Sequence, residues 1–198
     1  ADLIRDRHCY LLSDEVYEHI VFDGEAHRSL LSHDELYERT MVVSSFGKTF
    51  HATGWKIGYC IAPAYLTNEF RKVHQFATFS ISTPVQYGIA DFLNSDPDFY
   101  EALPAFYQQK RDTFCKLLEN SRFKLKPAQS TFFQIVDYSE ISDQDDLALA
   151  KHWTRDIGIA SIPLSVFCQQ AFTGSRLRFC FAKDDATLEA AAAKLNRL

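Results

Sequence analysis

Three short and nearly continuous apolar runs constrain the fold of the first half of the chain. They occupy residues 9–13, 41–45 and 57–62. Strands that are buried on both faces have this pattern, because helices cover each side of their sheet. Between residues 64 and 77 the apolar side chains recur instead at helical spacing. This alternation predicts an α/β fold in which a mostly parallel sheet lies between two layers of helices.

The second half of the chain has a different pattern. Residues 98–120 favour one long helix, which Pro104 is expected to kink. We expect two domains, residues 1–105 and residues 106–198, with the boundary inside this helix. The second domain is predicted to be a smaller α+β unit. Its expected strands are at 123–125, 131–136, 159–162 and 177–182, and its expected helices are at 146–156 and 187–198.

The first eight residues resemble the last turns of a helix whose beginning is absent. A strand-like run follows them at once, and no capping signal comes before it. We therefore expect the chain to be the later part of a longer protein.

The composition argues against several classes of protein. The net charge is −5 and both signs are spread along the chain, whereas a nucleic-acid-binding surface is normally basic. No apolar run is long enough to cross a membrane. The five cysteines are scattered and odd in number, so their spacing predicts neither a disulfide framework nor a metal site. Reduced thiols and a cytoplasmic protein are expected.

Lys48 is the first candidate for chemistry. Its apolar neighbours, Phe46 and Phe50, disfavour a charged ammonium group and so favour an amine that can form a Schiff base. Ser45 lies three residues before it and Lys56 eight residues after it. A hydroxyl and an ammonium group at these positions could each bind a phosphate. For Lys48 considered alone, an exposed loop lysine is the alternative.

Two further candidates follow the first strand-like run. Asp14 stands where that run ends, which is the usual position of functional groups in an open α/β sheet. Tyr17 comes three residues later. A helix cap or a turn residue is the alternative role for an isolated aspartate at such a position.

Arg178 is the candidate of the second half. Strict alternation predicts Leu177 and Phe179 on one face of a strand and Arg178 on the other. An arginine in an otherwise apolar strand needs a partner, because an unpaired buried charge is costly. A carboxylate bound bidentately suits it, and a salt bridge to one of the chain's own acids is the alternative.

The segment from Ser44 to Tyr59, with the string Ser-Asp-Glu-Val-Tyr that ends at Tyr17, resembles the cofactor-lysine region of a known family. The family is the fold-type I, class I/II aminotransferases, which depend on pyridoxal phosphate. The resemblance covers nearly the whole chain. It is strongest to the branch of methionine aminotransferases and kynurenine or glutamine transaminases. In these enzymes the corresponding segments belong to a three-layer large domain and a smaller C-terminal domain.

The resemblance implies a role for each candidate residue. Lys48 would bind the cofactor covalently, and Ser45 and Lys56 would hold its phosphate. Asp14 would pair with the pyridine nitrogen, and Tyr17 would donate a hydrogen bond to the ring oxygen. By the same resemblance, Arg178 would hold the α-carboxylate of the substrate. Glu15 and Glu18 are expected to be solvated charges, and no metal ligand is expected.

The resemblance also implies an activity and partners. The activity is transfer of an amino group from a hydrophobic or sulfur-containing amino acid, methionine-like or aromatic, to a 2-oxo acid. Alternatives are a pyridoxal-phosphate-dependent carbon–sulfur β-lyase and a non-catalytic aminotransferase-like fragment. The expected partners are a second copy in a homodimer and the missing N-terminal half of the same protein. Neither nucleic acid nor membrane is expected as a partner.

Overall fold

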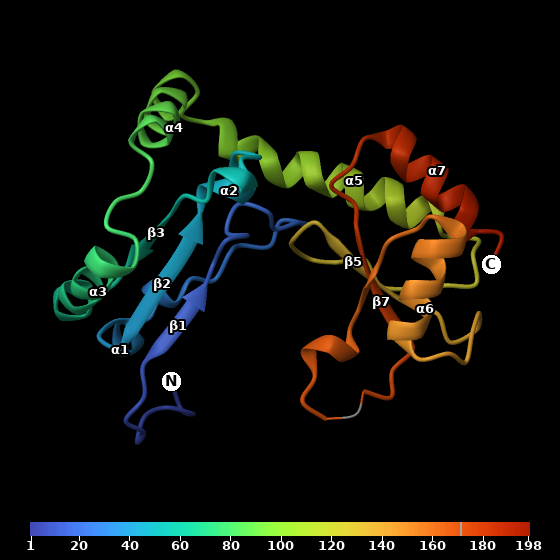
Figure 1. Ribbon diagram of the computed structural model, residues 1–198, viewed down its shortest axis with the longest axis horizontal. Coiled ribbons are helices and arrows are strands. Elements are labelled where there is room, and N and C mark those ends of the chain that lie inside the picture. The colour runs from blue at the N-terminus through green and yellow to red at the C-terminus, as the bar shows by residue number, and fades with distance from the viewer. Residues whose placement is uncertain (171) are drawn as a thin grey trace. The chain divides into compact units, whose positions relative to one another are not determined.

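The computed structural model describes residues 1–170 and 172–198. The chain divides into two compact units, Ala1–Leu103 and Pro104–Leu198. Figure 1 colours the first unit from blue to green and the second from green to red. Each unit has its own sheet.

The first unit contains a sheet of three described strands in the order β1-β2-β3 (Figure 1). β1 (Leu11–Asp14) and β2 (Thr40–Ser45) are parallel. β3 (Gly58–Ile61) is antiparallel to β2. All three strands fall within one or two residues of the apolar runs that predict them. The sheet is mixed, because β1 is parallel to β2 and β3 is antiparallel to it.

Helices and short turns make up most of the rest of this unit. The predicted helix at 64–77 coincides with α3 (Ala64–Ala77). The other elements are α1 (Asp34–Tyr37), α2 (Phe46–Thr49), α4 (Thr83–Ser95) and the 3₁₀ turns at Leu30–Ser32, Thr53–Trp55 and Phe99–Ala102. Near the N-terminus the chain forms turns, with Ile4 N–H donating to the Ala1 carbonyl, where the last turns of a helix were expected.

An aromatic cluster fixes the end of α2 in the first unit. The Phe50 ring lies 5.5 Å from that of Phe92 in α4 and 5.9 Å from that of Phe99, measured between centroids. Phe92 and Phe99 are themselves 5.1 Å apart. Aromatic pairs of this kind hold their elements in one arrangement. The four-residue α2 is thus anchored at its C-terminal side by tertiary packing.

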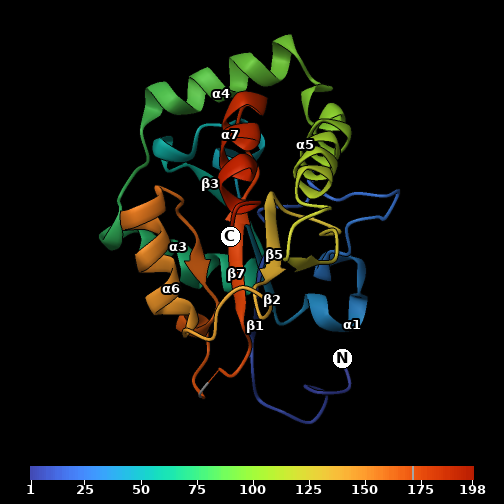
Figure 2. The ribbon, with the colours of Figure 1, turned by 90° about the vertical axis from the view of Figure 1, so that its right-hand side faces the viewer.

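The second unit contains a four-stranded antiparallel sheet in the order β4-β5-β7-β6. Figure 2 shows β5 beside the central β7. The strands are β4 (Lys124–Leu125), β5 (Phe133–Asp137), β6 (Ile162–Pro163) and β7 (Arg176–Cys180). The helices are α5 (Leu103–Leu117), α6 (Asp146–His152), which continues as a π-helical turn (Trp153–Ile157), and α7 (Asp185–Leu195). The unit has the predicted α+β character.

Pro104 does not kink a long helix, as the sequence had suggested. A 3₁₀ turn covers Phe99–Ala102, and α5 begins at Leu103. Pro104 is therefore the second residue of α5, where its missing N–H is not needed and its fixed φ suits the helix. The division between the two units falls at the same place.

The described residues contain neither a membrane-spanning helix nor a metal-binding cluster. No helix among them is both long and apolar enough to cross a membrane. No group of three or more His, Cys, Asp or Glu side chains among them could hold a metal ion.

Candidate active site

The carboxyl ends of β1 and β2 bring two of the predicted site residues to one edge of the sheet. Asp14, the last residue of β1, is paired with Val43. The N–H of the following residue, Glu15, donates to the Val43 carbonyl at 2.9 Å. Ser45 ends β2 two residues beyond Val43. Because parallel strands end at the same edge, Asp14 and Ser45 both lie at the edge where open α/β sheets bind ligands.

Ser45 also starts the short helix that contains Lys48. Its hydroxyl oxygen accepts the Gly47 N–H at 3.0 Å, which caps α2. The same hydroxyl donates to the Ile57 carbonyl at 3.2 Å. Lys48 is the third residue of α2 and is half-buried, between the buried Gly47 and Thr49. To donate to a phosphate, the Ser45 hydroxyl has to exchange its bond to Ile57.

The loop after Lys48 returns to Ser45. The Phe46 N–H donates to the Ile57 carbonyl at 3.2 Å, and Gly58 is the cross-strand partner of Ser45. Lys56 therefore reaches the same edge of the sheet as Ser45. It is exposed and has a left-handed backbone with φ of 54°. The structure thus brings the backbone of Lys56 close to that of Ser45, and the binding of a phosphate by their side chains stays a prediction.

Close backbone contacts explain two glycines of this segment. A Cβ on Gly58 would lie 2.4 Å from the Ser44 carbonyl oxygen, and one on Gly47 would lie 2.9 Å from the Thr53 Cα. Thr53 also donates its hydroxyl proton to the Gly47 carbonyl at 3.0 Å. A Cβ on Gly54 would meet no atom within 4 Å. The loop is therefore tight at its two ends and open at Gly54.

Asp14 and Tyr17 lie at the start of the turn that follows β1. The Asp14 side chain is exposed and accepts the Val16 N–H at 3.2 Å. This hydrogen bond is typical of the turn residue that was the alternative role for Asp14. It leaves most of the carboxylate available to other donors. Tyr17 is half-buried, and its carbonyl accepts the Ile20 N–H at 2.9 Å.

The expectation that Glu15 is a solvated charge is wrong. Glu15 is only 7% exposed. Its carboxylate accepts hydrogen bonds from Ser13 Oγ (3.0 Å), the Leu30 N–H (3.0 Å) and His27 Nε2 (2.9 Å). Burial by itself raises the pKa of Glu15, but these hydrogen bonds outweigh burial and lower the pKa below its usual value. Its partners hold the segment after β1 in place.

Glu18 was also expected to be solvated and is likewise bonded. It accepts hydrogen bonds from Ser44 Oγ at 2.8 Å and from the Tyr59 hydroxyl. Burial, together with the bond to Glu18, raises the pKa of Tyr59 to about 12. The partners of Glu15 and Glu18 are 12 to 41 residues away in sequence, apart from Ser13. No local pattern could therefore have revealed these networks.

Arg178 lies in the second unit, on β7. The alternation is as predicted, because Leu177 and Phe179 are buried on the opposite face of the strand. The guanidinium carbon is 4.1 Å from the centroid of the Phe133 ring and 5.2 Å from that of Phe167. Its Nε is buried and has no hydrogen-bond partner among the described residues. No acidic side chain among them forms an ion pair with it, so the salt-bridge alternative finds no support there.

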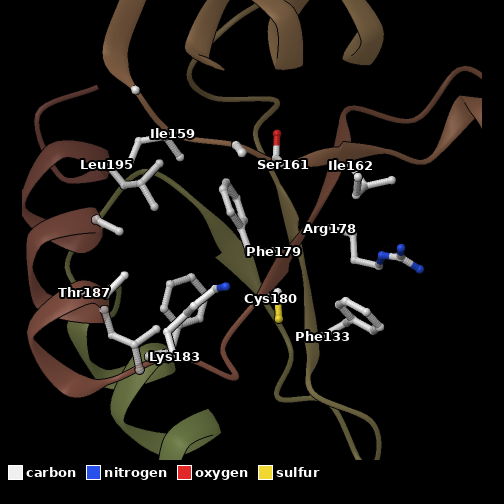
Figure 3. A pocket seen from close by; sticks show the side chains of 15 residues that line it. Phe133, Ile159, Ser161, Ile162, Arg178, Phe179, Cys180, Lys183, Thr187 and Leu195 are labelled. Carbon is white, nitrogen blue, oxygen red and sulfur yellow. The ribbon is translucent and has the colours of Figure 1, made fainter. Parts of the chain in front are cut away.

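A cavity of about 380 Å³ lies beside Arg178. Figure 3 shows Arg178, Phe133 and Ile162 on one side of β7, and Leu195 and Lys183 on the other. Ser161 Oγ, also at this cavity, is a second buried polar atom without a partner among the described residues. Buried donors of this kind are costly unless a ligand or water satisfies them. The sequence did not identify Phe133 or Ser161 as parts of a site.

Comparisons with known proteins agree with the resemblance seen in the sequence. The family model for aminotransferase class I and II matches residues 1–195. Methionine aminotransferase of Escherichia coli K12 is 51% identical over 96% of this chain, and a kynurenine–oxoglutarate transaminase of Dictyostelium discoideum is 35% identical over 95%. The chain spans about half the length of these relatives, 49% and 48%.

Solved structures confirm the fold class. One is the crystal structure of an E. coli protein that its structure and reactivity identify as a methionine aminotransferase. It has a TM-score of 0.94 and 49% identity to this chain, and the match covers 100% of this chain and 52% of that one. N-succinyldiaminopimelate aminotransferase of Mycobacterium tuberculosis has a TM-score of 0.89 and 32% identity, covering 95% and 49%. With a family model that matches residues 1–195, this chain belongs to the aminotransferase class I and II family.

Proposed function

We propose that this chain carries the Schiff-base lysine and the carboxylate-binding arginine of an aminotransferase that uses pyridoxal phosphate. Its reaction is transfer of an amino group from a hydrophobic or sulfur-containing amino acid to a 2-oxo acid. The observation that carries the proposal is the shared edge of β1 and β2, where Asp14 ends one strand and Ser45 leads into the helix of Lys48. The family relationship supports the same reaction.

The residues at this edge fit the cofactor. Asp14 is an exposed carboxylate with one local hydrogen bond, so it can also meet a protonated ring nitrogen. Ser45 and Lys56 offer a hydroxyl and a positive charge on neighbouring backbone, which suits a phosphate group. When bound, pyridoxal phosphate supplies an electron sink for the carbanion that forms at the substrate Cα.

Each residue has a defined task in this proposal. The Lys48 amine would hold the cofactor covalently, and as a free amine it would move a proton at the substrate Cα as general base and acid. Asp14 would keep the ring nitrogen protonated. The Tyr17 hydroxyl would donate a hydrogen bond to the ring oxygen.

Arg178 is proposed to hold the α-carboxylate of the amino acid. Its planar guanidinium can bind a carboxylate bidentately. The buried Nε without a partner supports this role, because a bound carboxylate would satisfy it. Phe133 and Phe167 lie against the guanidinium and limit the directions from which a carboxylate can reach it.

The proposed amino donor is methionine-like, since a relative that is 51% identical is named a methionine aminotransferase. Aromatic donors are included because other relatives, 30% to 35% identical, are named kynurenine–oxoglutarate transaminases. The proposed location is the cytoplasm. Five free cysteines are consistent with a reducing compartment.

The proposed partners are a second copy of the protein and a further portion of the same polypeptide. Exposed apolar side chains of the first unit support this. Leu12, in the middle of β1, is 72% exposed, and α3 has no buried residue although Val73 and Phe76 are apolar. Apolar surface of this extent is typical of an interface.

Reduction with borohydride tests the lysine assignment. Wild-type protein, Lys48→Ala and Lys72→Ala are mixed with pyridoxal phosphate, reduced, digested and analysed by mass spectrometry. Lys72 is the control because it is an exposed lysine of the same unit, paired with Glu69. We expect the cofactor mass on the peptide of Lys48 in wild type and Lys72→Ala, and its loss in Lys48→Ala. Modification that persists in Lys48→Ala contradicts the proposal.

A panel of donors tests the reaction. Methionine, phenylalanine, kynurenine and glutamine are offered with several 2-oxo acids, and the amino-acid product is measured. We expect the amino group to appear on the oxo acid, with the highest rate for a methionine-like or aromatic donor. Release of pyruvate and ammonia from a cysteine conjugate, without amino transfer, would instead identify a β-lyase.

A further inference from the structure

We propose that Glu18 is a positioning residue. Its carboxylate ties the turn that contains Tyr17 to the two strands that flank the Lys48 segment. The inference rests on the proposed function, because it assigns Glu18 the task of holding Tyr17 and Lys48 in one geometry around pyridoxal phosphate.

One oxygen of the Glu18 carboxylate bridges two strands. Glu18 Oε1 accepts the hydroxyl proton of Ser44 at 2.8 Å and also that of Tyr59. Ser44 on β2 and Tyr59 on β3 are cross-strand partners. Hydrogen bonds to a charged acceptor are stronger than neutral ones. A single side chain from the turn after β1 is therefore fastened to both strands at the same register position.

The pair of Ser44 and Tyr59 lies next to the start of α2. Ser44 precedes Ser45, the cap of α2. Tyr59 follows Gly58, whose backbone lies so close to the Ser44 carbonyl on β2 that no Cβ would fit. The Tyr59 ring also packs 5.3 Å from the ring of Phe46, the first residue of α2, measured between centroids. A displacement of Ser44 or Tyr59 is thus passed to the helix that contains Lys48.

The other end of the bridge is the turn with Tyr17. Glu18 is its immediate neighbour, and the Glu18 N–H donates to the Glu15 carbonyl at 2.9 Å. Glu15 is itself held by the Leu30 N–H and His27. The turn is therefore closed on one side by Glu15 and on the other by Glu18. Glu18 therefore adds a side-chain anchor to the turn that contains Tyr17, beside the bonds of Glu15.

The chemistry of the contact suggests a graded set of variants. Both donors use the same acceptor oxygen, so Glu18→Gln keeps an oxygen that can accept them, whereas Glu18→Ala removes it. Ser44→Ala and Tyr59→Phe each remove one donor. Glu25→Ala is the matched control, because Glu25 is an exposed glutamate of the same unit.

The test compares these variants in the intact protein loaded with pyridoxal phosphate. The readouts are the absorbance and visible circular dichroism of the bound cofactor, and kcat and KM for methionine. Glu18→Ala is expected to change the dichroism band and to lower kcat about tenfold to a hundredfold, as small misplacements of catalytic groups do. Glu18→Gln should restore most of both properties, and Glu25→Ala should match wild type. A merely structural role would lower thermal stability and leave the spectrum of the folded fraction unchanged.

Several results would overturn the inference. An unchanged spectrum and kcat in folded Glu18→Ala is one of them. If that variant does not fold, Tyr59→Phe and Ser44→Ala decide the matter, since each is expected to give part of the effect and wild-type behaviour in both contradicts it. The double variant Glu18→Gln with Tyr59→Phe should lose less than the sum of its single changes. If wild-type protein shows no cofactor on Lys48, the proposed function has failed, which is a separate outcome.

Discussion

The guanidinium of Arg178 lies over the ring of Phe133, with 4.1 Å between the guanidinium carbon and the ring centroid. Cations over aromatic faces are attracted by the ring's electron density. This contact orients the plane of the guanidinium, and the Nε of Arg178 has no hydrogen-bond partner among the described residues. The positions come from the antiparallel pairing of β5 with β7, in which Arg178 faces Ile135 and Phe133 faces Cys180.

Arg178→Lys is expected to weaken amino-acid binding and to leave cofactor binding unchanged. A lysine keeps the charge but loses the bidentate geometry and the stacking on Phe133. We expect KM for the amino donor to rise at least about tenfold, which corresponds to about 1.4 kcal/mol. Steady-state kinetics and pyridoxal phosphate titration measure the two effects separately. Arg176→Lys, an exposed neighbour on the same strand, is the control, and equal effects from the two changes would contradict the assignment.

Asp146 is expected to support Arg178 from a distance. Its buried carboxylate accepts the Ser165 N–H at 2.7 Å, in the 3₁₀ turn Ser165–Phe167. Phe167 at the end of this turn faces Arg178. Asp146→Ala leaves the Ser165 N–H without its acceptor, which costs about 1–3 kcal/mol.

Urea unfolding and kinetics check the role of Asp146. We expect lower stability and a higher KM for the amino donor in Asp146→Ala, and smaller changes in Asp146→Asn, which keeps an acceptor oxygen. Asp145→Ala tests specificity. Asp145 caps α6 through the Ala148 N–H, so its loss should lower stability without raising KM. A KM that does not change in Asp146→Ala argues against the link to Arg178.

Periodic apolar residues predicted the helices and strands whose buried face is set by their own sequence, such as α3, β2 and β3. The helix at 64–77 matches α3 because its apolar side chains alone define a face. The buried runs around β2 and β3 likewise mark their strands. The four-residue α2 was not predicted, because so short a helix depends on the Ser45 cap and the Phe50 cluster rather than on periodicity. The predicted kink at Pro104 was wrong because a proline kinks a helix only in its interior, and the sequence did not show that α5 begins at Leu103.

The candidate site divides in the same way. Lys48, Ser45 and Asp14 were identified from motif and strand ends, and the structure brings Asp14 and Ser45 to one edge. The networks of Glu15 and Glu18 were missed, because most of their partners come from distant segments and a glutamate next to polar residues looks solvated. Long-range hydrogen bonds leave no period or spacing in a sequence.

Gly58→Ala is expected to destabilise the protein, whereas Gly54→Ala is not. A Cβ on Gly58 would lie 2.4 Å from the Ser44 carbonyl oxygen, and the clash is with backbone that cannot move independently. Overpacking of this kind costs about 1–3 kcal/mol. Gly54 lies in the same loop with open space around its Cβ position, so its substitution should change stability by less than about 0.5 kcal/mol. Denaturant unfolding compares the two, and similar losses would rule out the steric explanation.

The buried Glu15 is expected to make stability depend on pH in the acid range. Burial raises the pKa of Glu15, but hydrogen bonds, led by the one from His27, outweigh it and lower the folded-state pKa below the usual value of a glutamate. A lowered folded-state pKa means that the ionised carboxylate stabilises the fold above the unfolded pKa. That contribution is lost as the pH falls through the folded-state pKa.

Glu15→Gln tests this linkage. The variant should be less stable than wild type at neutral pH, because it cannot carry the charge that the His27 side chain and the Leu30 N–H meet. The difference should shrink as the pH falls through the lowered folded-state pKa of Glu15, since the wild-type carboxyl then becomes protonated and is uncharged like the glutamine. Urea unfolding of both proteins between acid and neutral pH measures the difference, with Glu25→Gln as an exposed control. A difference in the free energy of unfolding that stays constant across this pH range would show that the packing of the Glu15 side chain, and not its charge, stabilises the fold.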